Sequence, residues 1–141
     1  ILLVKNPAGF NLTLDLLTHI ANSEIILMLN DKIADGKDVS WIWDSQLEIL
    51  KKIKPKTIIC SGTRASDMLL RVKYALPNLK ATKTRDNYFD SETKTAIILA
   101  KETGDIFNFL KESSSTDFYV LATYTAMLEI RKIIVGNSLN I

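Results

Sequence analysis

Residues 24–44 read EIILMLNDKIADGKDVSWIWD, in which a short apolar run leads directly into a connection rich in aspartate and tryptophan. An uninterrupted apolar run of this length, Glu24 to Leu29, is typical of a β-strand that is buried on both faces. Such strands lie in parallel sheets, because the helices that connect parallel strands cover both sides of the sheet. The run therefore predicts an α/β fold.

Strand and helix signals alternate along the rest of the chain. Besides 24–29, strands are expected at 1–5, 57–60, 80–83 and 118–122. Helices are expected at 10–22, 44–53, 64–76, 91–103, 105–111 and 124–134. This alternation predicts a Rossmann-like, mostly parallel sheet with helices on both faces, formed by residues 1–141 as a single domain.

Composition excludes several classes of function. The 18 basic residues are nearly balanced by 16 acidic ones and form no basic stripe, so no nucleic acid partner is expected. No apolar run approaches the roughly 20 residues that a transmembrane helix needs, so no transmembrane segment is expected. The sequence lacks a GxxxxGK[ST] phosphate loop. Its one histidine, His19, and one cysteine, Cys60, lie far apart in the sequence, and no metal site is expected.

Ligands and catalytic groups of parallel sheets gather where the strands end at their carboxyl side. Four segments of this chain follow expected strands: 6–10, 30–44, 61–64 and 123–125. The stretch from Asn6 to Asn11 is either a plain strand-to-helix turn or a place where the backbone approaches a ligand closely. Arg64 begins a helix, where it either holds a carboxylate in two parallel hydrogen bonds or points into solvent.

The connection between residues 29 and 44 contains the only two tryptophans of the chain and four aspartates, Asp31, Asp35, Asp38 and Asp44. Each aspartate is open to an ordinary reading as a turn or helix-cap residue. Trp41 and Trp43 alternate as in a short extended segment, so one should face the core and the other a second surface. A carboxylate beside such an anchor could orient a histidine of another protein, as in a nucleophilic triad.

Four segments, KNPAGFN, DVSWIWD, SGTRASDMLLRVKYA and VLATYTAMLEIRK, together resemble the C-terminal domain of the Mur-ligase-like subunit of lipid II isoglutaminyl synthases, the MurT family. The resemblance runs from residue 1 to about residue 134. It implies a fold of the Mur ligase C-terminal domain type. It also implies that the chain is the C-terminal fragment of a longer Mur-ligase-like chain, whose N-terminal and central ATP-binding domains are absent from it.

The resemblance also implies a function. The family's ligase subunit pairs with GatD, a glutaminase of the class I amidotransferase type, which releases ammonia from glutamine. The ligase subunit uses ATP to activate the α-carboxyl of D-glutamate in the lipid II stem peptide, and amidates it to D-isoglutamine. ATP and Mg²⁺ are then expected mainly outside this chain, with none bound by this domain alone. Action is expected in the bacterial cytoplasm at the inner face of the membrane, and the isolated domain should be inactive as a ligase.

The family's C-terminal domain docks the glutaminase and lends an aspartate to its Cys-His pair. In this sequence Asp44 is the expected catalytic carboxylate, and Asp38 is the alternative. The residues expected at the interface with the partner are Trp41, Trp43, Asp35 and Asp38. In a second hypothesis, the domain docks the glutaminase but contributes no catalytic group, and is a non-catalytic interaction module.

By the same resemblance, Asn6, Asn11 and Arg64 are expected in the vicinity of the nucleotide or substrate. Mur ligases in general carry an Asn-Pro turn near the nucleotide and an arginine that holds the carboxylate of the incoming amino acid. Here the incoming group is ammonia, which has no carboxylate. An interface contact or a structural ion pair is therefore an equally good reading of Arg64.

Overall fold

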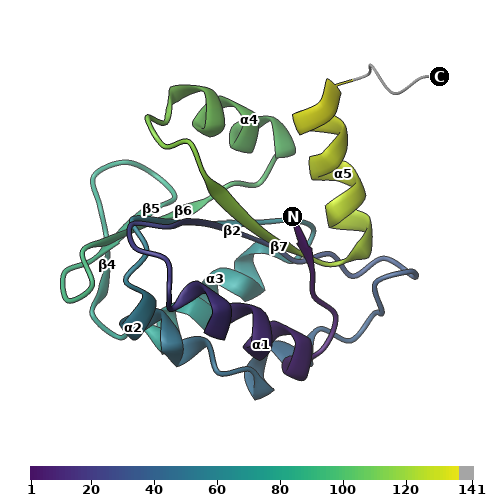
Figure 1. Ribbon diagram of the computed structural model, residues 1–141, viewed down its shortest axis with the longest axis horizontal. Coiled ribbons are helices and arrows are strands. Elements are labelled where there is room, and N and C mark those ends of the chain that lie inside the picture. The colour runs from purple at the N-terminus through teal and green to yellow at the C-terminus, as the bar shows by residue number, and fades with distance from the viewer. Residues whose placement is uncertain (137–141) are drawn as a thin grey trace.

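Seven strands form one sheet in the computed structural model, which describes residues 1–136 (Figure 1). The strands are β1 (Leu2–Leu3), β2 (Glu24–Met28), β3 (Thr57–Ser61), β4 (Leu79–Ala81), β5 (Asn87–Asp90), β6 (Thr95–Leu99) and β7 (Phe118–Ala122). Their order across the sheet is β1-β7-β2-β3-β6-β5-β4. The first five run parallel, and β5 and β4 add antiparallel pairs at one edge. The predicted Rossmann-like, mostly parallel α/β sheet is confirmed.

Helices cover both faces of this sheet. They are α1 (Pro7–Leu17), α2 (Leu50–Ile53), α3 (Ala65–Ala75), α4 (Thr103–Glu112) and α5 (Tyr124–Val135), with short 3₁₀ helices η1 (Ser40–Asp44) and η2 (Leu47–Ile49). Figure 1 shows α1, α2 and α3 below the sheet, and α4 and α5 above it. Within residues 1–136, no helix has both the length and the apolar character needed to cross a membrane.

The central strand β2 and the residue that follows it, Leu29, supply side chains to both hydrophobic layers. Ile25, Leu27 and Leu29 belong to the cluster that packs against α1 and α3. Ile26 and Met28 belong to the cluster that packs against α4 and α5. Successive side chains of a strand point to opposite faces, so a strand covered on both sides must be apolar at every position. This is why the run from residue 25 to residue 29 has no polar interruption.

The prediction of a helix over residues 91–103 is wrong. Residues 87–99 instead form the hairpin β5–β6. The Asp90 carboxylate accepts hydrogen bonds from the backbone N–H and the hydroxyl of Thr93, and Lys94 has a φ of 60°. These features make a tight turn, and the β-branched residues that follow it suit a strand better than a helix.

Two further helix boundaries differ from the prediction. The first helix begins at Pro7 rather than residue 10, because the Asn6 side chain caps it by accepting the N–H of Gly9 at 2.9 Å. Proline suits the first helical position, since its missing N–H would have no partner there. The expected helix 44–53 is divided into η2 and α2, and it ends where Lys54 takes a φ of 49°. The Asn-Pro stretch is therefore a cap and a first helical turn.

We expect Gly62→Ala to be far more destabilising than Gly36→Ala. Both glycines have positive φ, +97° and +91°, so both alanine variants carry a similar backbone cost of about 1 kcal/mol. A Cβ at Gly62 would lie 2.4 Å from the Leu29 carbonyl oxygen, whereas one at Gly36 meets nothing within 4 Å. Gly62→Ala should therefore cost about 2–3 kcal/mol more in the free energy of unfolding, measured by urea titration. Equal costs would contradict the close approach of the two strand ends.

Candidate functional site

The two tryptophans lie in the 3₁₀ helix η1, so the predicted extended segment is wrong. One tryptophan still faces the core and the other the surface, because residues two apart in a 3₁₀ helix point in different directions. Trp41 packs edge-on against Phe10 of α1, with ring centroids 5.7 Å apart, and contacts the main hydrophobic cluster. Trp43 is 45% exposed and lies edge-on to Tyr74 of α3 at 5.3 Å. Trp41 is thus the core tryptophan and Trp43 the surface one.

Arg71 of α3 lies beneath η1 and is only 3% exposed. Its Nε donates to the Ile42 carbonyl at 2.9 Å, and its Nη2 donates to the Ser45 carbonyl at 2.7 Å. The Glu48 carboxylate pairs with the same guanidinium at 2.9 Å. The hydrogen bond from Arg71 holds the pKa of the Glu48 carboxyl below its ordinary value of 4.5. A buried cation is tolerated here because it has both a counter-charge and carbonyl acceptors.

Sequence reasoning missed Arg71, although a signal for it exists. Met68, Val72 and Ala75 form the buried stripe of α3. Arg71 falls three residues after Met68, inside the same buried stripe. A charged residue in such a stripe indicates a buried ion pair.

The side chains of Asn6 and Asn11 have structural roles within this chain. Asn6 caps α1, as described above. Asn11 accepts the backbone N–H of Gln46 through Oδ1 at 2.7 Å, which ties α1 to the connection between η1 and η2. The segment that carries both tryptophans is therefore fixed by α1 on one side and by α3 on the other. The expected place of these two asparagines near a nucleotide stays a prediction.

Asp31 and Arg64 form an ion pair at the carboxyl ends of β2 and β3. Arg64 donates from Nη1 to Asp31 at 3.2 Å and from Nε to Asp67 at 2.7 Å. Hydrogen bonds from the Thr63 hydroxyl and from Arg64 lower the pKa of the Asp31 carboxyl. Both carboxylates held by Arg64 thus come from its own chain, which fits the structural ion pair among the readings of this arginine.

Asp35 binds the amino end of α5, ninety residues further along the chain. Its Oδ1 accepts the backbone N–H of Thr125 at 2.7 Å, and its Oδ2 accepts the hydroxyl of the same residue. A carboxylate at this position satisfies a free N–H of the first helical turn and complements the helix dipole. The expected place of Asp35 at a partner interface stays a prediction.

Asn30 joins these strand ends and was given no role from the sequence. It is 1% exposed. Its Nδ2 donates to the Thr125 hydroxyl at 2.9 Å, and its Oδ1 accepts the Thr63 N–H at 2.8 Å. The available signal was a polar residue placed directly after a fully apolar strand. Its satisfied amide locks the loops after β2, β3 and β7 together.

Asp38 and Asp44 are both exposed, but they differ in their contacts. The Asp38 carboxylate accepts the Ser40 N–H at 2.8 Å, and hydrogen bonding to the side chain and backbone of Ser40 lowers the pKa of the Asp38 carboxyl. For Asp44, which ends η1, no hydrogen bond or ion pair to the side chain is present in the described part of the chain. Among the four aspartates of this connection, Asp44 therefore has the carboxylate that is free to accept a hydrogen bond from another molecule.

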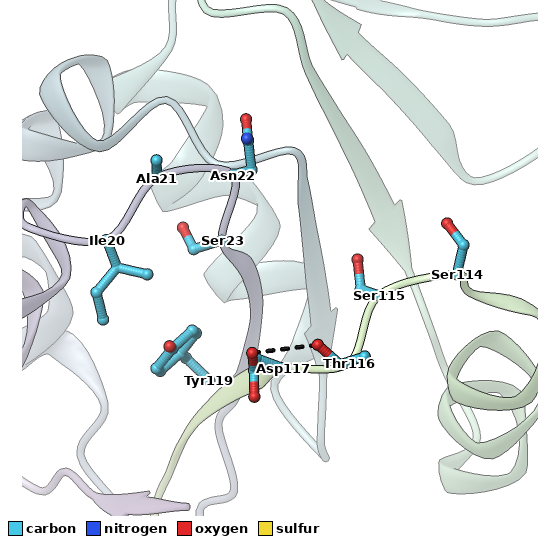
Figure 2. A pocket seen from close by; sticks show the side chains of 9 residues that line it. All are labelled: Ile20, Ala21, Asn22, Ser23, Ser114, Ser115, Thr116, Asp117 and Tyr119. Carbon is cyan, nitrogen blue, oxygen red and sulfur yellow. Dashed lines mark hydrogen bonds between the residues drawn. The ribbon is translucent and has the colours of Figure 1, made fainter.

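Three of the expected site residues line one shallow pocket of about 240 Å³: Asp38, Trp43 and Arg64. A second pocket, shown in Figure 2, lies at the opposite end of the sheet, where the parallel strands begin, between the loops that precede β2 and β7. It is lined by small polar side chains, including the buried hydroxyl of Ser23, which has no hydrogen-bond partner within the described residues. None of the expected site residues lies there.

Cys60 is fully buried, and burial raises the pKa of its thiol to about 12, so it is not a nucleophile in the folded chain. Within residues 1–136, no group of three or more histidine, cysteine, aspartate or glutamate side chains is arranged to hold a metal ion.

Comparison with known proteins gives consistent matches. The model of the family described as "MurT ligase C-terminal" matches residues 3–127. The MurT subunit of lipid II isoglutaminyl synthase (glutamine-hydrolyzing) from Staphylococcus aureus (strain COL) is 40% identical over 87 residues, which cover 61% of this chain and 20% of that protein. The protein of the same name from Streptococcus pneumoniae is 29% identical over 141 residues, which cover 99% of this chain and 28% of that protein. The chain thus spans less than a third of the length of these curated relatives.

Glu48→Gln should alter how stability depends on pH. The pKa of Glu48 is lower in the folded chain than its ordinary value of 4.5, so the folded state is the one that releases the proton more readily. The ion pair with Arg71 therefore stabilises the fold above pH 4.5, and this contribution is lost as the pH falls through the folded-state pKa. Urea unfolding should show Glu48→Gln less stable than wild type at neutral pH, with the difference shrinking in acid. The matched control is Glu112→Gln, which removes an exposed carboxylate that has no ion pair in the described structure. A difference for Glu48→Gln that stays constant with pH would contradict the ion pair.

Proposed function

The chain belongs to the MurT ligase C-terminal family, and from this premise we propose that it is the C-terminal domain of the ligase subunit of a lipid II isoglutaminyl synthase. The whole enzyme would amidate the α-carboxyl of D-glutamate in the lipid II stem peptide to D-isoglutamine. Its ammonia would come from a partner glutaminase of the GatD type. ATP and Mg²⁺ would bind mainly to other domains of the subunit. The reaction would take place in the cytoplasm, at the membrane face where lipid II is exposed.

An aromatic ridge beside η1 supports this chain's part in docking the glutaminase. We define the ridge as Trp43, Leu70 and Tyr74, which are 45%, 46% and 68% exposed. Leu70 and Tyr74 are one helical turn apart, so they share a face of α3, and the Trp43 ring contacts Tyr74. Large aromatic side chains that remain exposed in a folded chain are typical anchors of protein interfaces. The ridge is therefore the proposed contact surface.

The free carboxylate of Asp44 is the observation that carries the catalytic part of the proposal. A third triad member must accept a hydrogen bond from Nδ1–H of a histidine, keep that ring in the correct tautomer and stabilise its charged form. This role needs oxygen lone pairs that the chain itself does not use. Asp31 and Asp35 use both carboxylate oxygens in internal bonds, and Asp38 uses Oδ1. Asp44 uses neither oxygen, and it directly follows the exposed Trp43.

In the proposed reaction the partner's histidine would take the proton of the partner's cysteine, which then attacks the side-chain amide carbon of glutamine. The same histidine would protonate the departing ammonia. Asp44 would touch neither cysteine nor glutamine, and its contribution would be the orientation and charge of the imidazole.

Asp44→Asn should reduce glutamine hydrolysis by the assembled complex by up to about 10⁴-fold, because an amide cannot stabilise the imidazolium ion and favours the wrong tautomer. Binding between the subunits should change little. The measurement is ammonia release by the glutaminase alone and with wild type, Asp44→Asn or Asp38→Asn. Loss with Asp38→Asn alone would move the role to Asp38. Equal rates with and without this chain, in a complex that forms, would leave the domain as a docking module only.

The two tryptophans should give separate phenotypes. Trp43→Ala should weaken binding of the glutaminase by at least about 2 kcal/mol, because it removes an exposed anchor, and should change the free energy of unfolding by no more than about 1 kcal/mol. Trp41→Ala should instead destabilise the fold by about 2–4 kcal/mol, because its ring packs against Phe10 and the core. Titration calorimetry and urea unfolding measure the two quantities. Tight binding by Trp43→Ala would exclude the ridge as the contact surface.

A further inference from the structure

The dipeptide Trp43–Asp44 is attached at both ends to one buried guanidinium. Arg71 binds the carbonyl of Ile42, which precedes Trp43, and the carbonyl of Ser45, which follows Asp44. We propose that Arg71 is the positioning residue of this dipeptide and sets where the Asp44 carboxylate and the Trp43 ring are presented to the partner. This inference rests on the proposed function, which assigns those two side chains their roles.

The turn formed by η1 is closed by bonds of its own. The Asp38 carboxylate accepts the Ser40 N–H at 2.8 Å, and the Ser45 hydroxyl donates to the Ile42 carbonyl at 2.5 Å. The backbone bonds at its two ends are longer, 3.2 Å from Ile42 N to Val39 O and 3.4 Å from Ser45 N to Ile42 O. The bonds from Arg71 to the same segment measure 2.9 and 2.7 Å and come from a charged donor. Charge-assisted bonds of that length are about twice as strong as neutral ones, so Arg71 adds a strong constraint on both sides of the Trp43–Asp44 dipeptide.

An arginine at position 71 is better explained by positioning of the Trp43–Asp44 dipeptide than by stabilisation of the fold. The site lies in the buried stripe of α3, where an apolar side chain of similar size would pack without the cost of burying a charge. A guanidinium offers rigid, planar donors that can bind two carbonyls and a carboxylate at once. Glu48 neutralises the charge and fixes the plane of the group. Lysine would keep the charge but could not hold both carbonyls in the same geometry.

The side chains of the dipeptide depend on this support to different degrees. The Trp43 ring lies 5.6 Å from the guanidinium carbon and also contacts Tyr74, so it has side-chain neighbours on two sides. The Asp44 carboxylate has none within the described residues, so only the backbone determines its place. Movement of the turn would therefore displace Asp44 more than Trp43.

The test is Arg71→Lys in the full-length subunit assembled with its glutaminase. We expect kcat for glutamine hydrolysis to fall about 10–100-fold, since a displacement near 1 Å can cost about 100-fold in rate. KM for glutamine should stay within about twofold, because glutamine would bind to the partner, as should the Kd of the complex, because Trp43 keeps its contact with Tyr74. The matched control is Thr95→Val, which removes a buried hydrogen bond of 2.7 Å to the Pro55 carbonyl without touching η1. It should lower stability and leave kcat unchanged.

A second readout does not depend on the proposed function. In a Trp41→Phe background, with any tryptophan outside residues 1–141 also replaced by phenylalanine, Trp43 is the only tryptophan, and its acrylamide quenching reports the mobility of the turn. Arg71→Lys should raise the quenching constant of the free subunit by about twofold, because transient opening of η1 exposes the Trp43 ring more often, although the contact with Tyr74 re-forms in the closed state. Thr95→Val should leave it unchanged.

The outcomes of these experiments distinguish the positioning role of Arg71 from the catalytic role of Asp44. Greater quenching together with lower kcat supports the inference. Unchanged quenching overturns it, whatever happens to the rate. Greater quenching with unchanged kcat also overturns it, because the turn would then be held without consequence for the reaction. If Asp44→Asn has no effect on the rate, the catalytic role proposed for Asp44 fails, and quenching alone then shows whether Arg71 holds the turn.

Discussion

Burial of β2 on both faces is the constraint on which the remaining structure depends. Its alternate side chains reach two separate hydrophobic clusters, so helices must cover both sides of the sheet. The chain then has to leave this buried strand without unsatisfied polar groups. Asn30 meets that need by bonding to Thr63 and Thr125, and Gly62 allows β3 to end against the Leu29 carbonyl. The connection that follows β2 is fixed at its start because the core cannot move.

The four aspartates of the connection after β2 fall into two groups, because three of them make bonds within the chain and one does not. Asp31 holds Arg64, Asp35 caps α5, and Asp38 begins the turn into η1. Together they turn a long loop into a rigid surface, since each bond removes freedom that a loop would otherwise keep. Only Asp44 ends this series with an unused carboxylate. A rigid support with one free functional group is what orientation of a partner's side chain requires.

Local patterns predicted most of the fold, and tertiary contacts account for what they missed. The apolar runs placed β2, β3 and β7 well, because burial on both faces leaves a clear signal. Residues 91–103 were misassigned because Ala96, Ile97 and Ala100 also fit a helical spacing, and the turn at Asp90 depends on side-chain bonds. The role proposed for Asp44 followed from resemblance. Its free carboxylate and the support from Arg71 could not be foreseen, since the partners of Arg71 lie 23 to 29 residues away.

In the proposed complex, Asp44 completes a catalytic group supplied by another protein. The most direct measurement is an experimental structure of the full-length subunit with its glutaminase, in which the distance from the Asp44 carboxylate to the nearest imidazole nitrogen of the partner is read. We expect a hydrogen bond of about 2.7–3.0 Å to Nδ1, with the Trp43 ring buried in the interface. A complex in which Asp44 faces solvent, or in which a carboxylate of the glutaminase already occupies that position, would contradict it.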